Sequence, residues 1–188
     1  MYSASDLRKG LKIEIEGVPY EVVDFQFVKP GKGQAMYKCR LKNMLAGNNM
    51  DRTFRAADHI DQPNLEERDL VYSYSEGDDY HFIDKETYDQ FSIHANIIGD
   101  QKFFLQEDLA VEVLFHNGRV VSVTLPSFVE KKIIETEPGA RGDTATNVLK
   151  PAKLDNGYEI GVPLFINAGD TIKIDTRTGK YFERVSRG

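Results

Sequence analysis

The segment 29–34 reads Lys-Pro-Gly-Lys-Gly-Gln and is the most unusual local feature of the sequence. Glycines on both sides of Lys32 remove side-chain crowding and permit positive φ angles, so Lys32 is expected at a narrow, exposed hairpin tip. There its amine can enter a crevice that is closed to the body of a domain. An ordinary glycine-rich turn with a solubilising lysine has the same pattern, so the pattern alone leaves both interpretations open.

The residues around this tip are strongly basic. Between positions 28 and 55 there are seven Lys or Arg residues and one acid, Asp51, a balance of +6. Such a patch is typical of proteins that contact a phosphate backbone, although a merely solvated face remains an alternative. The tip is not a nucleotide-binding P-loop, because the G-x-x-x-x-G-K-[ST] spacing and a following helix signal are missing. The predicted nucleic-acid contacts in this region are Lys29, Lys38, Arg40, Lys42, Arg52 and Arg55.

A second small-residue loop spans residues 138–146 and carries one positive charge. Its glycines allow close approach to a ligand, and Arg141 and Thr144 are candidates for contacts to phosphate or base edges. A long unstructured loop would have the same composition.

No residue constellation predicts catalysis or a metal site. The single cysteine, Cys39, excludes an internal disulfide and lies in an alternating segment that predicts a buried strand position. The four histidines show no metal-ligand spacing. No carboxylate pair or nucleophile motif stands out, so we do not expect an enzyme.

Alternating apolar residues and short turn signals predict an all-β chain of small barrels. Residues 11–16 and 20–27 flank the turn 17–19, and a second hairpin places Tyr37, Cys39 and Leu41 on one buried face, with Lys38, Arg40 and Lys42 facing solvent. At about 3.3 Å per residue, its arms hold the tip roughly 20 Å from the strand bases. Asn117-Gly118 predicts a type I′ hairpin between 111–115 and 120–125. Short helices are expected within 85–93 and 99–108.

Charge and turn composition divide the chain into three predicted domains, at 1–63, 64–126 and 127–188. The formal net charge of −6 separates into +2, −9 and +1 over these ranges. An acidic middle domain would be repelled by RNA, which would concentrate RNA contacts on the outer two. The longest apolar runs are far short of the roughly 20 residues of a membrane-spanning helix, and no secretory signal is evident, so a cytoplasmic location is expected.

Two motifs resemble those of the bacterial translation elongation factor P family. One is the tip segment 29–35; the other runs from Lys150-Pro-Ala152 through Gly157-Tyr-Glu-Ile160 to Gly169 and fits the family's C-terminal signature. The resemblance covers the whole chain. It implies an SH3-like (KOW-type) N-terminal domain followed by two OB-fold domains, in an L-shaped, tRNA-like arrangement.

The resemblance also implies a function. Members of this family bind the ribosome between the peptidyl and exit sites when it stalls on consecutive prolines. By similarity, Lys32 is the post-translationally modified residue, and Pro30, Gly31, Gly33 and Gln34 form its tip loop. The loop most resembles those of members with a β-lysyl extension, and members with other lysine modifications have nearly the same loop. The stretch Gly142-Asp143-Thr144 resembles a loop that lies near the exit-site codon.

The implied partners are large-subunit RNA near the peptidyl-transferase centre, the peptidyl-site tRNA, the exit-site mRNA codon and lysine-modifying enzymes. The protein is expected to be a monomer that binds no membrane and needs no separate cofactor. Two alternatives remain. One is a paralogue with a different or modification-independent target, and the other is a general OB-fold binder of single-stranded nucleic acid.

Overall fold

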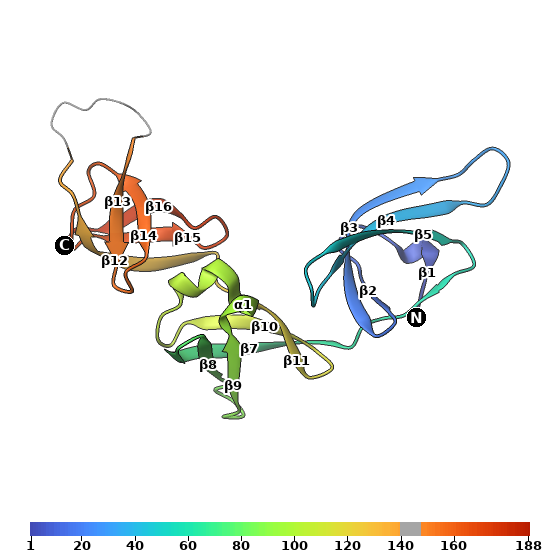
Figure 1. Ribbon diagram of the computed structural model, residues 1–188, viewed down its shortest axis with the longest axis horizontal. Coiled ribbons are helices and arrows are strands. Elements are labelled where there is room, and N and C mark those ends of the chain that lie inside the picture. Colours follow the sequence, from blue (N-terminus) through green and yellow to red (C-terminus); the bar gives the residue numbers. More distant parts are fainter. Residues whose placement is uncertain (140–147) are drawn as a thin grey trace. The chain divides into compact units, whose positions relative to one another are not determined.

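The computed structural model describes residues 1–139 and 148–188. Over these residues the regular structure is mainly β-strand, with only three short helical turns, which confirms the predicted all-β fold class (Figure 1). The contacts divide it into two compact units, residues 1–67 with 114–121, and residues 68–113 with 122–188. Within the described residues, no helix has the length and apolar character needed to cross a membrane.

The strands of the first part are β1 Tyr2–Ser3, β2 Lys12–Ile15, β3 Val18–Val28, β4 Met36–Asn43, β5 Asn49–Arg55 and β6 His59–Ile60. Those that follow are β7 Leu65–Glu76, β8 Asp79–Ile83, β9 Gln90–His94, β10 Ala110–His116 and β11 Arg119–Thr124. The last are β12 Phe128–Thr136, β13 Leu149–Leu154, β14 Glu159–Pro163, β15 Thr171–Asp175 and β16 Lys180–Ser186. Helical turns lie at η1 Ala4–Asp6, α1 Ala95–Ile98 and η2 Gly99–Phe104.

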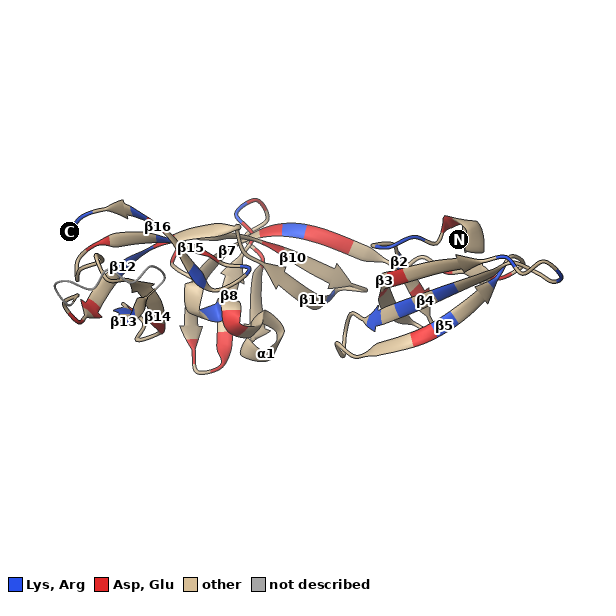
Figure 2. Cartoon of the chain, turned by 90° about the horizontal axis from the view of Figure 1, so that it is seen from above, with Lys and Arg blue, Asp and Glu red and all other residues tan. Residues whose placement is uncertain are grey.

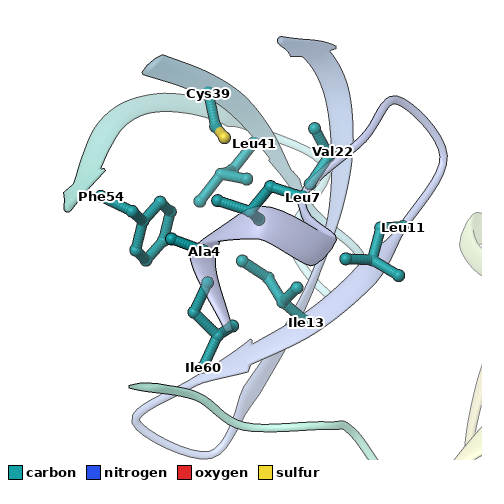
Figure 3. Packing of buried hydrophobic residues seen from close by; sticks show 9 residues of the cluster. All are labelled: Ala4, Leu7, Leu11, Ile13, Val22, Cys39, Leu41, Phe54 and Ile60. Carbon is teal, nitrogen blue, oxygen red and sulfur yellow. The ribbon is translucent and has the colours of Figure 1, made fainter. Parts of the chain in front are cut away.

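The N-terminal sheet has the strand order β2-β3-β4-β5 and is antiparallel throughout. Alternation along β4 places Cys39 and Leu41 in the core, as predicted, with Tyr37 half-buried beside them. The short pairing of β1 with β6 closes the far side of this core. Figure 3 shows the packed cluster, whose members are Ala4, Leu7, Leu11, Ile13, Val22, Cys39, Leu41, Phe54 and Ile60.

The middle sheet has the order β11-β10-β7-β8-β9 and the C-terminal sheet the order β14-β13-β12-β15-β16. Numbered from the first strand of each sheet, both orders are 3-2-1-4-5. This is the order of a five-stranded OB barrel, and β14 also contacts β16 at the open side of the C-terminal sheet. The turn between β10 and β11 has positive φ at both Asn117 (50°) and Gly118 (80°), as a type I′ turn requires.

One of the two helix predictions is confirmed and the other is wrong. Residues 99–108 do contain helix, as η2, but the helix expected within 85–93 is wrong, because β9 begins at Gln90. Asp84 explains the error. Its carboxylate accepts hydrogen bonds from the backbone amides of Glu86 and Thr87, which makes 84–87 a capped turn that leads into a strand.

Candidate nucleic-acid interface

The tip that carries Lys32 joins β3 to β4 and contains no regular structure. Gly33 has a φ of 132°, a value that a side chain disfavours, so the glycine after Lys32 is required by the backbone. Lys32 itself is exposed, and the ion pairs found among the described residues do not include it. Its amine is therefore available to a ligand.

A long two-stranded stem holds this tip away from the core. The strands β3 and β4 pair from Tyr20 opposite Asn43 to Val28 opposite Met36, and the pairing slips once, between Val22 and Asp24. Near the tip, the Tyr37 ring lies 5.1 Å from Phe27 and 6.2 Å from Phe25, centroid to centroid. Tyr37 and Phe25 pack against the core cluster, so these ring contacts tie the exposed Phe27, in the outer part of the stem, to the core.

Lys38, Arg40 and Lys42 form a basic row along the outer face of β4. All three side chains are exposed and point away from Cys39 and Leu41. Alternate residues of a strand are about 6.6 Å apart. That spacing is comparable to the spacing of successive phosphates along a nucleic-acid strand, so the row can follow a phosphate backbone.

Acidic residues flank this row on both neighbouring strands (Figure 2). The Arg40 Nε donates to Asp51 Oδ1 at 3.1 Å, and this hydrogen bond together with the charge of Asp51 raises the pKa of Arg40. Asp24 lies opposite Arg40 on β3. A hollow of about 310 Å³ lies here, with Lys38 and both carboxylates in its lining. Asp51 orients Arg40, and the two carboxylates together reduce the net positive charge of the face.

The structure separates the two arginines that were predicted on β5. Arg55 pairs with Met36 and shares the outer face with the basic row, near the tip end of the stem. Arg52 pairs with the buried Cys39, so it lies on the opposite face, where its guanidinium is 5.5 Å from the centroid of the Phe54 ring. Lys29 is exposed where β3 ends. Five of the six predicted basic residues therefore lie on the outer face or at the tip end of the stem. The sixth, Arg52, lies on the opposite face.

Four predicted contact residues lie outside the described residues. They are Arg141, Gly142, Asp143 and Thr144, and their role stays a prediction. The neighbouring C-terminal signature is described. Its Lys150 is buried and donates to the carbonyl of Glu137, and its Ile160, Val162 and Ile166 are core residues. That signature therefore serves the fold of the C-terminal sheet.

An aromatic and cationic cluster on the C-terminal sheet escaped the sequence reasoning. Phe128 and Phe182 have ring centroids 4.7 Å apart, and Phe182 is 54% exposed. Lys173 Nζ lies 5.8 Å and the Arg177 guanidinium 5.7 Å from the centroid of Phe128. The two rings are 54 positions apart in the sequence, so only the pairing of β12 with β15 and of β15 with β16 brings them together.

The remaining candidate groups are structural. Cys39 is 3% exposed, and burial raises the pKa of its thiol to about 11. His116 is buried, with its Nε2 2.9 Å from Glu14 Oε1. In the part of the chain that the structure describes, no group of three His, Cys, Asp or Glu side chains could hold a metal ion.

Comparison with protein families assigns each part of the chain. Residues 3–60 match the model of the elongation factor P (EF-P) KOW-like domain, residues 65–123 the EF-P OB domain, and residues 129–184 the elongation factor P C-terminal domain. Among solved structures, the archaeal "Eukaryotic translation initiation factor 5A from Methanococcus jannaschii" superposes with a TM-score of 0.58 at 22% identity. The match covers 66% of this chain and 91% of that one. That likeness supports the fold.

A KOW-like domain followed by an OB domain, each matched by an elongation factor P model, places the chain in a class of translation elongation factors. The chain is 50% identical over 186 residues to elongation factor P of Desulforapulum autotrophicum, and 47% identical over 187 residues to that of Desulfotalea psychrophila. The matches cover 99% and 100% of this chain, and 100% of each relative. The chain therefore belongs to the elongation factor P family.

Proposed function

We propose that this elongation factor binds the ribosome beside the peptidyl-site tRNA and accelerates peptide-bond formation at consecutive prolines. The observation that carries the proposal is Lys32, an exposed lysine free of the ion pairs found among the described residues, on a two-stranded stem that extends past the core. The outer basic row of Lys38, Arg40 and Lys42 supports an RNA partner along the same stem. Action at the ribosome also places the protein in the cytoplasm.

The proposed mechanism is positional. Proline is a poor nucleophile in a constrained geometry, so the reaction is limited by alignment of the two tRNA ends. A factor that holds the peptidyl-tRNA in a reactive orientation raises the rate by lowering the entropy of misaligned states. It contributes no acid, base or nucleophile, and the chemistry remains that of the ribosome.

The finer part of the proposal is the extension of Lys32 by a β-lysyl group. An added cationic arm lengthens the reach of the tip and increases its attraction to RNA phosphates. A modifying enzyme can add the extension only if it can bind the tip. The exposed loop, with Gly33 at a φ of 132°, is consistent with such access. Exit-site contacts through Arg141 to Thr144 belong to the same proposal.

The test is Lys32→Ala in a translation assay with a Pro-Pro-Pro reporter. The variant is expected to fold with an unchanged melting temperature, because the tip buries nothing, and to lose nearly all rescue of the stalled reporter. Lys85→Ala, an exposed lysine of the middle domain, is the matched control and should retain full activity. Wild-type rescue by Lys32→Ala would refute the proposal. Intact-protein mass spectrometry of native material tests whether Lys32 is extended. An unmodified mass in fully active protein would refute the proposed extension.

A second candidate function is general binding of single-stranded nucleic acid. The pair Phe128 and Phe182 favours it, because exposed rings beside cations form stacking platforms for bases. The cations are themselves paired, since Arg177 bonds to Asp175 and Lys173 to Glu183, which weakens attraction to phosphates. Binding of a bare oligonucleotide as tightly as of ribosomes, lost in Phe182→Ala, would establish this function.

A further inference from the structure

A second group of basic residues lies in the N-terminal domain outside the basic row of β4. Arg8, Lys9 and Lys12 surround the start of β2, and the ion pairs found among the described residues include none of them. Arg8 and Lys9 are exposed and Lys12 is half-buried. Three cations this close together in the sequence raise the local positive potential.

Two of these cations line a hollow of about 410 Å³. Its lining residues are Tyr2, Arg8, Gly10, Leu11, Lys12, Gln62, Pro63 and Leu65. None of them is acidic, whereas the hollow on the basic row of β4 contains Asp24 and Asp51. The polar groups in this lining are a phenol, an amide and two cations, and all of these can donate hydrogen bonds to an anion.

The backbone around the hollow holds Arg8 in place. The amide of Leu11 donates to the carbonyl of Arg8 at 3.1 Å, and Gly10 has a φ of 91°, as a tight turn with glycine at its third position requires. Gly10 also donates to the carbonyl of Val22 at 2.7 Å, which ties the turn to β3. Leu7 and Leu11 are buried on either side. A cation on such an anchored turn loses less freedom on binding than one on a mobile loop.

The nearby carboxylates lie outside the lining of the hollow. Asp6 is directed at Ser3, because its Oδ2 accepts from the backbone amide of Ser3 at 2.9 Å and from the Ser3 hydroxyl at 3.1 Å, and it does not line the hollow. Glu21 lies opposite Lys12 in the ladder of β2 and β3, and opposite Lys42 in the ladder of β3 and β4. One carboxylate thus lies opposite two lysines, and the ion pairs found among the described residues involve neither Arg8 nor Lys9.

We infer that this hollow is a second RNA contact of the protein, which takes a phosphodiester of an RNA backbone. Arg8 presents a planar fork that matches two phosphate oxygens, and Lys12 adds a point charge from the adjacent strand. Gln62 and Tyr2 can bond to the neighbouring sugar. The inference rests on the proposed function for its RNA partner, but it concerns different residues from Lys32 and the row on β4.

The test compares the double variant Arg8→Gln/Lys12→Gln with Lys85→Gln/Lys102→Gln, which changes the net charge equally in the acidic middle domain. Binding is measured across a salt series with two probes, vacant ribosomes and deacylated tRNA. The first variant is expected to bind at least one probe about tenfold more weakly at 0.1 M salt, with the slope of log affinity against log salt smaller by about 1.5 for two lost contacts. The control should match the wild type. Which probe is affected tells whether ribosomal RNA or tRNA supplies the phosphate.

Two further variants keep the test decisive. Arg8→Lys/Lys12→Arg preserves both charges and should restore most of the affinity, which a purely structural defect would not allow. Equal affinity and slope for the glutamine variant and its control, with both probes, would overturn the inference. If Lys32→Ala rescued the reporter normally while Arg8→Gln/Lys12→Gln still bound weakly, the proposed function would fail and the phosphate site would stand.

Discussion

Cys39 lies between two residues of the basic row in the sequence, yet burial protects its thiol from reaction. Its neighbours Lys38 and Arg40 face solvent, while its own side chain is in the N-terminal core. Desolvation by burial disfavours the thiolate and raises the pKa of the thiol to about 11 from 9.0. The thiol is therefore expected to be unreactive in the folded protein.

That raised pKa makes stability depend on pH. The unfolded thiol ionises near pH 9 and the folded one near 11, so the unfolded state binds fewer protons between these values and the free energy of unfolding falls as pH rises. We expect wild type to lose about 1–2 kcal/mol more than Cys39→Ala between pH 9 and 11. Denaturant titrations of both proteins at each pH measure this difference.

The comparison with Cys39→Ala is needed because burial also raises the pKa of Tyr80 and Tyr181, whose ionisation acts in the same direction. The variant should cost about 1 kcal/mol at pH 7, for the lost sulfur. Parallel stability curves for the two proteins from pH 9 to 11, or rapid labelling of the native thiol at pH 8, would contradict the assignment.

The stem of β3 and β4 is the element on which the proposed function depends. A hairpin alone is marginally stable in water, and the outer part of this one receives little help from the core. Phe27 is 50% exposed, and its ring contact with Tyr37 supplies the nearest packing to the tip. Stiffness here determines how well the position of Lys32 is defined.

Tyr37→Ala is expected to lower the free energy of unfolding by about 2 kcal/mol, since it removes two aromatic contacts and half-buried apolar surface. Polyproline rescue should fall several-fold even though Lys32 is intact, because the tip samples more orientations. Tyr88→Ala is the control, at a side chain that is 73% exposed, and should leave both quantities unchanged. A Tyr37→Ala protein with wild-type stability and rescue would show that the stem needs no aromatic support.

At the scale of the whole molecule, the middle and C-terminal OB barrels pack as one compact unit. Tyr158 stacks on Phe103 at 4.6 Å between centroids and meets the edge of Phe104 at 5.5 Å. Lys131 is buried at the same junction, where its Nζ donates to the carbonyl of Leu105 at 3.1 Å and burial lowers its pKa. Each barrel is small for independent folding, so this shared surface contributes to the stability of both.

Tyr158→Ala is therefore expected to reduce the free energy of unfolding of this unit by about 2–3 kcal/mol and to make the thermal transition broader, as the two barrels unfold less cooperatively. Calorimetry measures both effects. Tyr74→Ala serves as the control, because Tyr74 is exposed and stacks on His81 within the middle sheet alone. A single sharp transition at the wild-type temperature in Tyr158→Ala would mean that the barrels are held together by other contacts.

Much of the fold and the tip were predictable from local patterns. The alternation around Cys39, the turn at Asn117-Gly118 and the glycine after Lys32 each follow from the conformational preferences of a few consecutive residues. The same reasoning misplaced a helix in 85–93, because the bonds from Glu86 and Thr87 to the Asp84 side chain compete with helix formation in a way that apolar periodicity does not reveal.

The sequence by itself determined an all-β chain, the exposed lysine at a hairpin tip and the basic row along one strand, because strand alternation and turn chemistry are local properties. Only the tertiary structure decided that Arg52 faces away from that row, that Phe128 meets Phe182, and that Arg8 and Gln62 line one hollow. These depend on which distant strands pair and in what register. Strand pairing and register are set by the burial of side chains summed over a whole sheet. They therefore cannot be predicted from any short segment of the chain.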